Sequence, residues 1–369
     1  MTNILRKPNG KYQARYSDLS GRQRAKEFER KHDAQVWLAN IQADLSRGLY
    51  VDPSAGKTLF KVFAAEWLAN QIHQKPTTRE QVETNLKNHI LPTFGDRPLA
   101  SIRPSHVQAW VRDRSNVIAP ATVELVYRYL STIFRAAVTD QVIAVSPCQK
   151  IGLPQRERRE VHPLSTRQID QLVDGVGERY KALVIAAAGT GMRQGELFGL
   201  TVDRVDFLRG RSIRVDRQLI ALKGEQPKFG PPKTKASVRT IPLPAVVGDA
   251  LALHLQRFGS SPQGLIFTGE NDEPLRRNRF SERVWRPAVK ATGMENAHFH
   301  DLRHFYASLL IRHGESVKVV QARLGHANAQ ETLDTYSHLW PDSDDTTRAA
   351  VDDVLGPIWS TDGQQNIAK

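Results

Sequence analysis

A charged, proline-rich stretch at residues 146–163 constrains the fold most, because it divides the chain into separately folding parts. It reads SPCQKIGLPQRERREVHP, with three prolines, a run of Arg, Glu and His, and few apolar residues. Prolines and charges of this kind favour an extended linker. The 369 residues, 40% of them hydrophobic, can bury a core on either side of it. We therefore predict two or three domains, which the linker would allow to close around a rod-shaped partner.

The N-terminal part, about residues 10–52, is predicted to form a small strand-turn-strand-helix module. Lys11–Tyr16 and Arg22–Phe28 have the alternation of strands, and Asp18–Gly21 between them has turn chemistry. In Lys31–Arg47 apolar residues recur at helical spacing, and Gly48 ends the run. The predicted sheet carries five basic residues, which are Lys11, Arg15, Arg22, Arg24 and Lys26. Two interpretations stay open here: a sheet that lies against DNA, and an ordinary solvated basic hairpin.

The second part, up to the linker, is predicted to be wholly helical. Thr58 is a candidate cap for its first helix and Thr77 or Thr78 for the next. Pro104 and Pro120 each begin a further helix, since proline favours the first helical position. Basic residues lie between the apolar stripes of these helices, at Lys57, Lys61, Lys87, Arg103, Arg112, Arg114, Arg128 and Arg135. They indicate a compact basic bundle, although any one of them can be an ordinary surface charge.

The part after the linker is predicted to be mostly helical with two short strands, Ser212–Asp216 and Val238–Leu243. Ser165 is the predicted cap of its first helix. Between the strands the run Lys223–Lys235 is rich in Gly, Pro and Lys, which predicts a hairpin with Lys233 and Lys235 on its loop or edge.

Arg193 is the first candidate site residue of this part. A buried helical run, Leu183–Ala188, is interrupted by Gly189-Thr-Gly191, after which a new helix begins. The turn places Arg193 near a helix start, where backbone N–H groups already favour anions. Glu196 follows one turn later and is placed to orient Arg193 or a neighbouring residue.

The stretch from His300 to Tyr336 carries most of the remaining candidates. If residues 297–312 are helical, His300 and Arg303 share one face of that helix. Gly314 predicts a helix stop, Ser316 a new N-cap, and Gly325 the end of a second short helix, directly before His326. Cationic and imidazole groups that converge beside a phenol favour attack by the tyrosine on a phosphate.

Composition agrees with a nucleic-acid partner. The formal charge is +13 and the sequence pI is about 9.9, which favours a polyanion. The single cysteine, Cys148, excludes an intramolecular disulfide and a cysteine-based zinc site, as expected in a reducing compartment. We find neither a signal-peptide core at the start nor an apolar run long enough to cross a bilayer, so we expect a soluble cytoplasmic protein without a membrane partner.

With these motifs in place, the chain resembles the tyrosine recombinases, the integrases of the phage lambda type. The resemblance rests on TGMRQGEL, PKTKASVRTIPL, HDLRH, LGH and LDTYSHL, and it covers essentially the whole chain. It implies a multidomain, mainly α protein: a β-hairpin-plus-helix arm-site module (1–55), a four-helix core-binding domain (56–147), a linker (148–163) and a mixed, mostly α catalytic domain with a small antiparallel sheet (164–369). It also implies site-specific recombination of double-stranded DNA, for integration or excision of a phage or mobile element.

The physical chemistry agrees with that implication. Bidentate guanidinium groups of Arg193 and Arg303 suit the charge that develops on the phosphate oxygens. His326, and partly His300, can donate to the same oxygens, and His300 is the first choice for acid/base help to the nucleophile Tyr336.

The leaving 5′-oxygen needs a proton, for which a lysine on a mobile loop is suited. Lys233 is the candidate and Lys235 the reserve, since their order cannot be decided from the sequence. His304, His313 and His338 are interpreted as ordinary core or surface residues. A zinc site at His300, His304 and His326 is disfavoured, because HDLRH lacks the glutamate of HExxH.

A covalent 3′-phosphotyrosine conserves the energy of the DNA bond, so we expect neither ATP, metal nor another cofactor. The resemblance implies a homotetramer on synapsed attachment sites, with a directionality factor or a host DNA-bending protein as further candidate partners. The acidic helix predicted at Asp342–Leu355 is a candidate for packing on a neighbouring protomer. Two alternatives remain, a type IB topoisomerase-like enzyme and a non-catalytic DNA-binding protein with a decayed recombinase domain.

Overall fold

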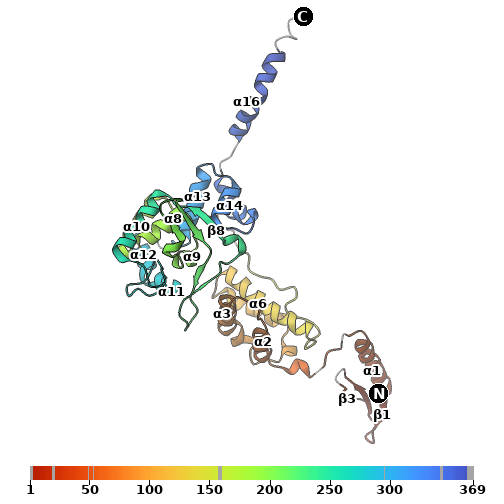
Figure 1. Ribbon diagram of the computed structural model, residues 1–369. Helices are drawn as coiled ribbons and strands as arrows, with labels where there is room; N and C mark the ends of the chain where they lie inside the picture. Colours follow the sequence, from red (N-terminus) through yellow and green to blue (C-terminus); the bar gives the residue numbers. More distant parts are fainter. Residues whose placement is uncertain are drawn as a thin grey trace. The chain divides into compact units, whose positions relative to one another are not determined.

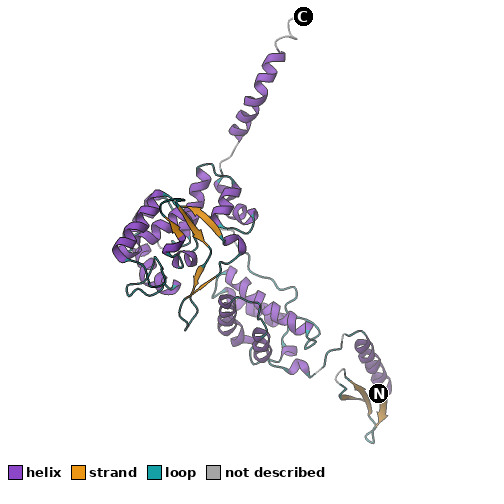
Figure 2. Cartoon of the chain, viewed as in Figure 1, coloured by secondary structure: helices purple, strands orange, loops and turns teal. Residues whose placement is uncertain are grey.

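The computed structural model describes residues 3–18, 21–48, 50–52, 54–156, 160–294, 296–340 and 344–363. It divides into two compact units, residues 1–157 and 158–369. Helices predominate, and the strands form three small antiparallel sheets in the described parts of the chain (Figure 2). Within those parts, every helix is too short or too polar to cross a membrane. The fold is thus the predicted multidomain, mainly α type.

The N-terminal module is a three-stranded sheet covered by one helix. Its elements are β1 (Asn3–Arg6), β2 (Tyr12–Ser17), β3 (Gln23–Phe28) and α1 (Lys31–Ser46). The two predicted strands and the helix are confirmed, while β1 was not predicted. Its four residues are too few to show an alternating pattern, and β1 is defined by its pairing with β2. Ala14 and Tyr16 of β2 pack with Leu38 of α1 to form the core.

The basic residues of this module do not share one face of the sheet. In the β2–β3 register Arg24 lies opposite Tyr16 and Lys26 opposite Ala14, so both point to the side that α1 covers. There Arg24 donates to Asp18 at 3.1 Å, and the ammonium of Lys26 lies 5.3 Å from the ring centre of Phe28. Arg15 points to the opposite side, because side chains alternate along a strand. The basic residues of the module are therefore divided between the two sides of the sheet.

The helical segment of this unit packs around one apolar core. Its elements are η1 (Ala55–Lys57), α2 (Phe60–Ala69), α3 (Pro76–Asn85), the π turn η2 (Leu86–Ile90), α4 (Leu91–Phe94), η3 (Leu99–Ser101), α5 (Pro104–Ser115) and α6 (Pro120–Thr139). Pro104 and Pro120 begin helices, as predicted. The predicted threonine caps are wrong. Pro76 takes the first position of α3, which places Thr77 and Thr78 inside its first turn, and α2 begins after an extended Leu59.

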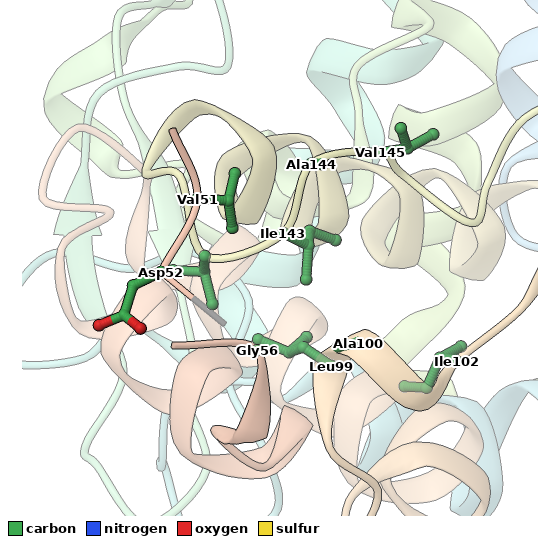
Figure 3. Close-up of a pocket in the computed structure, with 10 residues that line it drawn as sticks. Val51, Asp52, Gly56, Leu99, Ala100, Ile102, Ile143, Ala144 and Val145 are labelled. Carbon is green, nitrogen blue, oxygen red and sulfur yellow. The ribbon is translucent and has the colours of Figure 1, made fainter. Parts of the chain in front are cut away.

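A shallow cavity of about 260 Å³ lies within this unit (Figure 3). Its lining is mainly apolar and consists of Val51, Asp52, Gly56, Leu99, Ala100, Ile102, Val142, Ile143, Ala144 and Val145. Figure 3 shows the carboxylate of Asp52 directed away from the other labelled side chains. That carboxylate is bonded to Arg24 and to the Ser54 backbone. The cavity therefore offers little polar chemistry to a ligand.

The second unit contains the predicted mixed domain. Its first half comprises α7 (Thr166–Gly175), α8 (Glu178–Thr190), α9 (Gln194–Phe198), η4 (Val202–Arg204), β4 (Val205–Asp206), β5 (Ser212–Val215), β6 (Gln218–Ile220), β7 (Lys228–Gly230), η5 (Lys235–Ser237) and β8 (Arg239–Pro242). One sheet has the order β4-β5-β8, and β6-β7 is a separate hairpin. Ser165 caps α7 by accepting from the Gln168 N–H, as predicted. The hairpin, however, lies earlier than predicted, so Lys233 and Lys235 follow it.

The second half is helical. It comprises α10 (Ala245–Phe258), α11 (Arg277–Phe280), the π turn η6 (Ser281–Trp285), α12 (Arg286–Ala291), α13 (Asp301–Arg312), α14 (Val317–Leu324), α15 (Ala329–Tyr336), η7 (Ser337–Leu339) and α16 (Asp344–Gly363). Helix α8 is buried and packs against both α10 and α13 (Figure 1). The predicted C-terminal helix is confirmed from Asp344, and Asp342 lies outside the described residues. Val351, Val354 and Leu355 of α16 are exposed.

Candidate active site

Arg193 lies between α8 and α9, because Gly191 ends α8 just before it. Helix α8 runs through Gly189 and ends at Gly191, which has a φ of +62°. A Cβ on Gly191 would lie 2.4 Å from the Tyr306 ring, so a larger residue does not fit there. The chain then turns, and Arg193 takes the extended N-cap position of α9. The predicted break is thus at Gly191.

Glu196 joins two arginines at the start of α9. Its carboxylate accepts from the Arg193 backbone N–H at 2.9 Å, from the Arg193 guanidinium at 3.1 Å and from Arg239 at 2.9 Å. Burial by itself would raise the pKa of Glu196, but Arg239 and Arg193 hold that pKa below its ordinary value. The prediction that Glu196 orients Arg193 is confirmed, and Arg239 is a partner that the sequence did not reveal.

Arg303 is buried on α13 and is held by backbone carbonyls. Its guanidinium donates to the Gly191 oxygen at 2.6 Å and to the Leu324 oxygen at 2.7 Å, and only 3% of the residue is exposed. Burial, with the nearby cations Arg193 and Arg239, lowers the pKa of Arg303 to about 9. The group therefore stays a cation at neutral pH, and it ties the ends of α8 and α14 together.

His326 follows the glycine that ends α14. Gly325 has a φ of +66°, and its carbonyl accepts from Arg193 at 3.2 Å. The His326 Nδ1 lies 2.9 Å from the Thr332 hydroxyl, and its Nε2 lies 3.7 Å from the Glu331 carboxylate. Burial, together with Arg303 and Arg193, lowers the pKa of His326 to about 3. The imidazole is therefore neutral at pH 7. Both predicted features of α14, the Ser316 cap and the Gly325 stop, are confirmed.

Tyr336 is the last residue of α15 and is almost completely buried. Only 1% of it is exposed, and its hydroxyl lies 2.7 Å from the Nδ1 of His304. Burial raises the pKa of Tyr336 to about 12, against the opposing charge of Arg303. The free protein thus holds this residue as a neutral phenol, bonded to a histidine that the sequence interpretation had set aside.

His300 lies directly before α13 and is exposed. The helix begins at Asp301 and not near Ala297, because Asp301 accepts from the His298 N–H and closes a turn there. The His300 ring stands edge-on to that of His304, with centres 4.9 Å apart. Loss of water on its inner side and the neighbouring His304 and Arg303 lower the pKa of His300 to about 4.

Lys233 lies in the loop between β7 and η5, and Lys235 begins η5. The next residue after Lys233, Thr234, is hydrogen-bonded through its hydroxyl to Ser237 at 2.9 Å. Ser237 in turn accepts from the Arg193 guanidinium at 3.0 Å. The loop that carries Lys233 is therefore tied to the arginine cluster by two successive hydrogen bonds.

The structure thus brings Arg193, Arg303, His326 and Tyr336 into one connected region, with His300 beside it through His304. His304 could have been found from its spacing, since it lies four residues after His300 and therefore on the same side of the chain. Arg239 had no such local signal. His338 donates from Nε2 to the Val161 backbone oxygen, 2.9 Å away, apart from this region. Across the described residues, no group of three or more His, Cys, Asp or Glu could hold a metal ion.

Comparisons with known proteins match most of the chain. The model of the phage integrase family matches residues 163–342, and models of two N-terminal domains of phage integrases match residues 59–113 and 3–47. A relative from Mycobacterium tuberculosis, named as a prophage phiRv2 integrase, is 32% identical over 341 residues, which is 89% of each chain. The chain belongs to the phage integrase family. It is a site-specific tyrosine recombinase of the integrase type.

Other members of the phage integrase family agree in extent and fold. The integrase of Mycobacterium phage D29 is 26% identical, with 88% of this chain and 89% of the relative covered. A structure of the Tn1549 transposon integrase in complex with a circular intermediate DNA superposes with a TM-score of 0.67 at 22% identity, over 80% of this chain and 99% of the other. A lambda integrase dimer bound to a core site superposes with a TM-score of 0.58 at 18% sequence identity. That match covers 93% of this chain and 95% of the other. These two structures share the fold.

Proposed function

We propose that this recombinase cleaves and rejoins double-stranded DNA by forming a 3′-phosphotyrosine at Tyr336. The observation that carries the proposal is the convergence of Tyr336 with Arg303 and Arg193, which are held by carbonyls at the ends of α8 and α14. Arg303 donates to the carbonyls of Gly191 and Leu324, and the carbonyl after Leu324 accepts from Arg193. A phosphate near these groups would meet a preorganised cationic site beside a hydroxyl nucleophile.

The arginines bind the phosphate in this proposal. Arg193 is 23% exposed at its side chain, so it can reach an incoming anion while Glu196 fixes its orientation. Arg303 is buried and contributes its charge from behind. His326, neutral at pH 7 and held by Thr332, can donate a hydrogen bond from Nε2 to a phosphate oxygen.

Lys233 remains the proposed general acid for the leaving 5′-oxygen, with Lys235 in reserve. The supporting observation is the bond from Thr234 through Ser237 to Arg193, which connects the residue after Lys233 to the arginine cluster. His300 remains a proposed donor to that phosphate from the exposed rim of the site.

The relatives support a proposal for the wider assembly. We propose an arm-site module at residues 1–55, a core-binding domain at 56–147, a linker at 148–163 and a catalytic domain at 164–369, acting as a homotetramer on two attachment sites. The fold is shared by a lambda integrase that forms a tetramer bound to a Holliday junction. The exposed apolar residues of α16 support packing of that helix on a neighbouring protomer. A directionality factor or a DNA-bending host protein would be a further partner.

A nicked suicide substrate tests this proposal. Cleavage beside the nick releases a short fragment, so the covalent protein–DNA adduct accumulates and is measured by denaturing gel. We expect an adduct with the wild-type protein and none with Tyr336→Phe. Tyr180→Phe, in which a half-buried tyrosine packed against Phe280 loses the same hydroxyl, is the matched control and should react normally. Equal adduct from Tyr336→Phe and wild type would rule out Tyr336 as the nucleophile.

A further inference from the structure

The hydrogen bond between His304 and Tyr336 is the polar contact closest to the proposed nucleophile. His304 lies on α13 and Tyr336 at the end of α15, 32 residues apart in sequence, and His304 Nδ1 lies 2.7 Å from the phenol oxygen. The two rings are also in edge contact, with centres 5.6 Å apart at 65°. This is the distance and pairing that a nucleophile and its base require.

The protonation states decide the direction of this hydrogen bond. Burial lowers the pKa of His304 and raises that of Tyr336 to about 12, so at pH 7 the imidazole and the phenol are both neutral. A neutral imidazole can accept at one nitrogen only, and the phenol has one proton to donate. Tyr336 therefore donates its O–H to Nδ1 of His304, and the other proton of the imidazole is on Nε2.

The same geometry distinguishes His304 from His300. The His300 ring contacts the His304 ring, with ring centres 4.9 Å apart and an angle of 88° between the ring planes. His300 is exposed at the rim, whereas His304 is half-buried against the phenol. The acid/base role that the sequence assigned to His300 thus fits His304 better, because a base must reach the proton that it removes.

We propose that His304 is a further catalytic residue, the base that takes the Tyr336 proton when DNA is cleaved. The inference rests on the proposed role of Tyr336 as nucleophile. In cleavage, the bond from Tyr336 Oη to phosphorus forms while the phenol proton moves to His304 Nδ1. The bond from phosphorus to O5′ breaks, and O5′ takes a proton from Lys233. In rejoining, His304 returns its proton to the departing phenolate.

Burial lowers the pKa of His304, but one neighbour favours the imidazolium formed in this step. Asp301, one turn before His304 on α13, raises the pKa of His304, and Arg303 lowers it. The Asp301 carboxylate thus favours the charged form of His304. Rejoining returns His304 to its neutral form. Three groups from the neighbouring turns also face this region, which are His300, His326 and Glu331.

Two substitutions at His304 separate a base from a residue that only positions the phenol. In His304→Ala both functions are lost, whereas in His304→Asn an acceptor oxygen near the Nδ1 position remains but cannot take up a proton at neutral pH. We expect both variants to form the adduct on the suicide substrate about 10²- to 10⁴-fold more slowly than wild type. Added imidazole should partly restore His304→Ala. His313→Ala, in which an exposed histidine at the end of the same helix is removed, is the matched control.

A modified substrate separates His304 from Lys233. A sulfur in place of the bridging O5′ leaves without a proton, so this substrate should restore Lys233→Ala but leave His304→Ala slow. Thermal unfolding and binding of an uncleaved duplex, measured in parallel, show that the variants are folded.

Three outcomes would overturn the inference. They are a wild-type rate for His304→Ala, recovery of that rate by His304→Asn, and restoration of His304→Ala by the sulfur-containing substrate. Undiminished adduct from Tyr336→Phe would instead overturn the proposed function on which the inference rests.

Discussion

The basic residues of the N-terminal module and those of the active site are held in different ways. In the module Lys7 pairs with Glu27 and Lys11 with Glu29, and all four side chains are at least 38% exposed. In the active site Arg239 and Arg303 are buried. Arg239 shares Glu196 with Arg193, while Arg303 donates to backbone carbonyls.

The exposed pairs of the module and the buried arginines of the active site therefore differ in their ability to bind an anion. Exposed pairs neutralise each other in water and are screened by salt, so their positions contribute little to the fold. The active-site cluster has three guanidinium groups and one carboxylate, and it keeps a net positive charge in a place with little water. Such a cluster is stabilised by an anion of suitable shape, and the phosphate of DNA supplies one.

Arg303→Lys is the strongest test of the comparison. An ammonium cannot donate to the Gly191 and Leu324 carbonyls with the planar fork of Arg303, so the inner cation of the cluster loses its fixed position. We expect adduct formation to fall by about 10²- to 10³-fold, the loss typical of one donor to a transition-state oxyanion. Arg312→Lys, an exposed position on the same helix, should leave the rate unchanged. A rate for Arg303→Lys within threefold of wild type would contradict the role of the fork.

Glu196→Gln tests how much the cluster depends on its one carboxylate. Loss of one partner from a buried ion pair destabilises by about 3–5 kcal/mol, since the Arg239 side chain stays buried without compensation. Thermal unfolding should show this as a lower melting temperature, while Glu178→Gln, in an exposed pair with Lys181, should not.

The same variant has a definite pH dependence. Because the folded pKa of Glu196 lies below the unfolded value of about 4.3, its stabilising contribution is fully present above that pH and is lost as the pH falls through the folded pKa. The difference in melting temperature between wild type and Glu196→Gln should therefore shrink in acid. A difference that stays constant would show that the carboxylate charge is not the cause.

Lys7→Ala is expected to have the smallest effect on stability of these variants. Lys7 and Glu27 are exposed and solvated, so we expect no resolvable change in melting temperature at physiological salt. A clear destabilisation, removed by high salt, would show that the module also depends on its charges, and the contrast with the active site would then be one of degree.

Much of the fold followed from local sequence signals. The caps at Ser165 and Ser316, the stop at Gly325 and the helix starts at Pro104 and Pro120 all appear where they were predicted. Strand β1 and the start of α13 did not. Strand β1 is defined by its pairing with β2, and α13 begins where Asp301 accepts from the His298 N–H of the preceding turn.

The sequence by itself determined several helix caps and stops and marked Arg193, Arg303, His326 and Tyr336 as candidates, because caps, glycine turns and motif spacing depend on residues a few positions apart. Only the tertiary structure decided which histidine meets the phenol and which second arginine shares Glu196. His304 and Tyr336 are 32 residues apart and Glu196 and Arg239 are 43 apart, and both pairs meet through the packing of separate elements. Spacing within one helix cannot say which of its side chains another helix will reach.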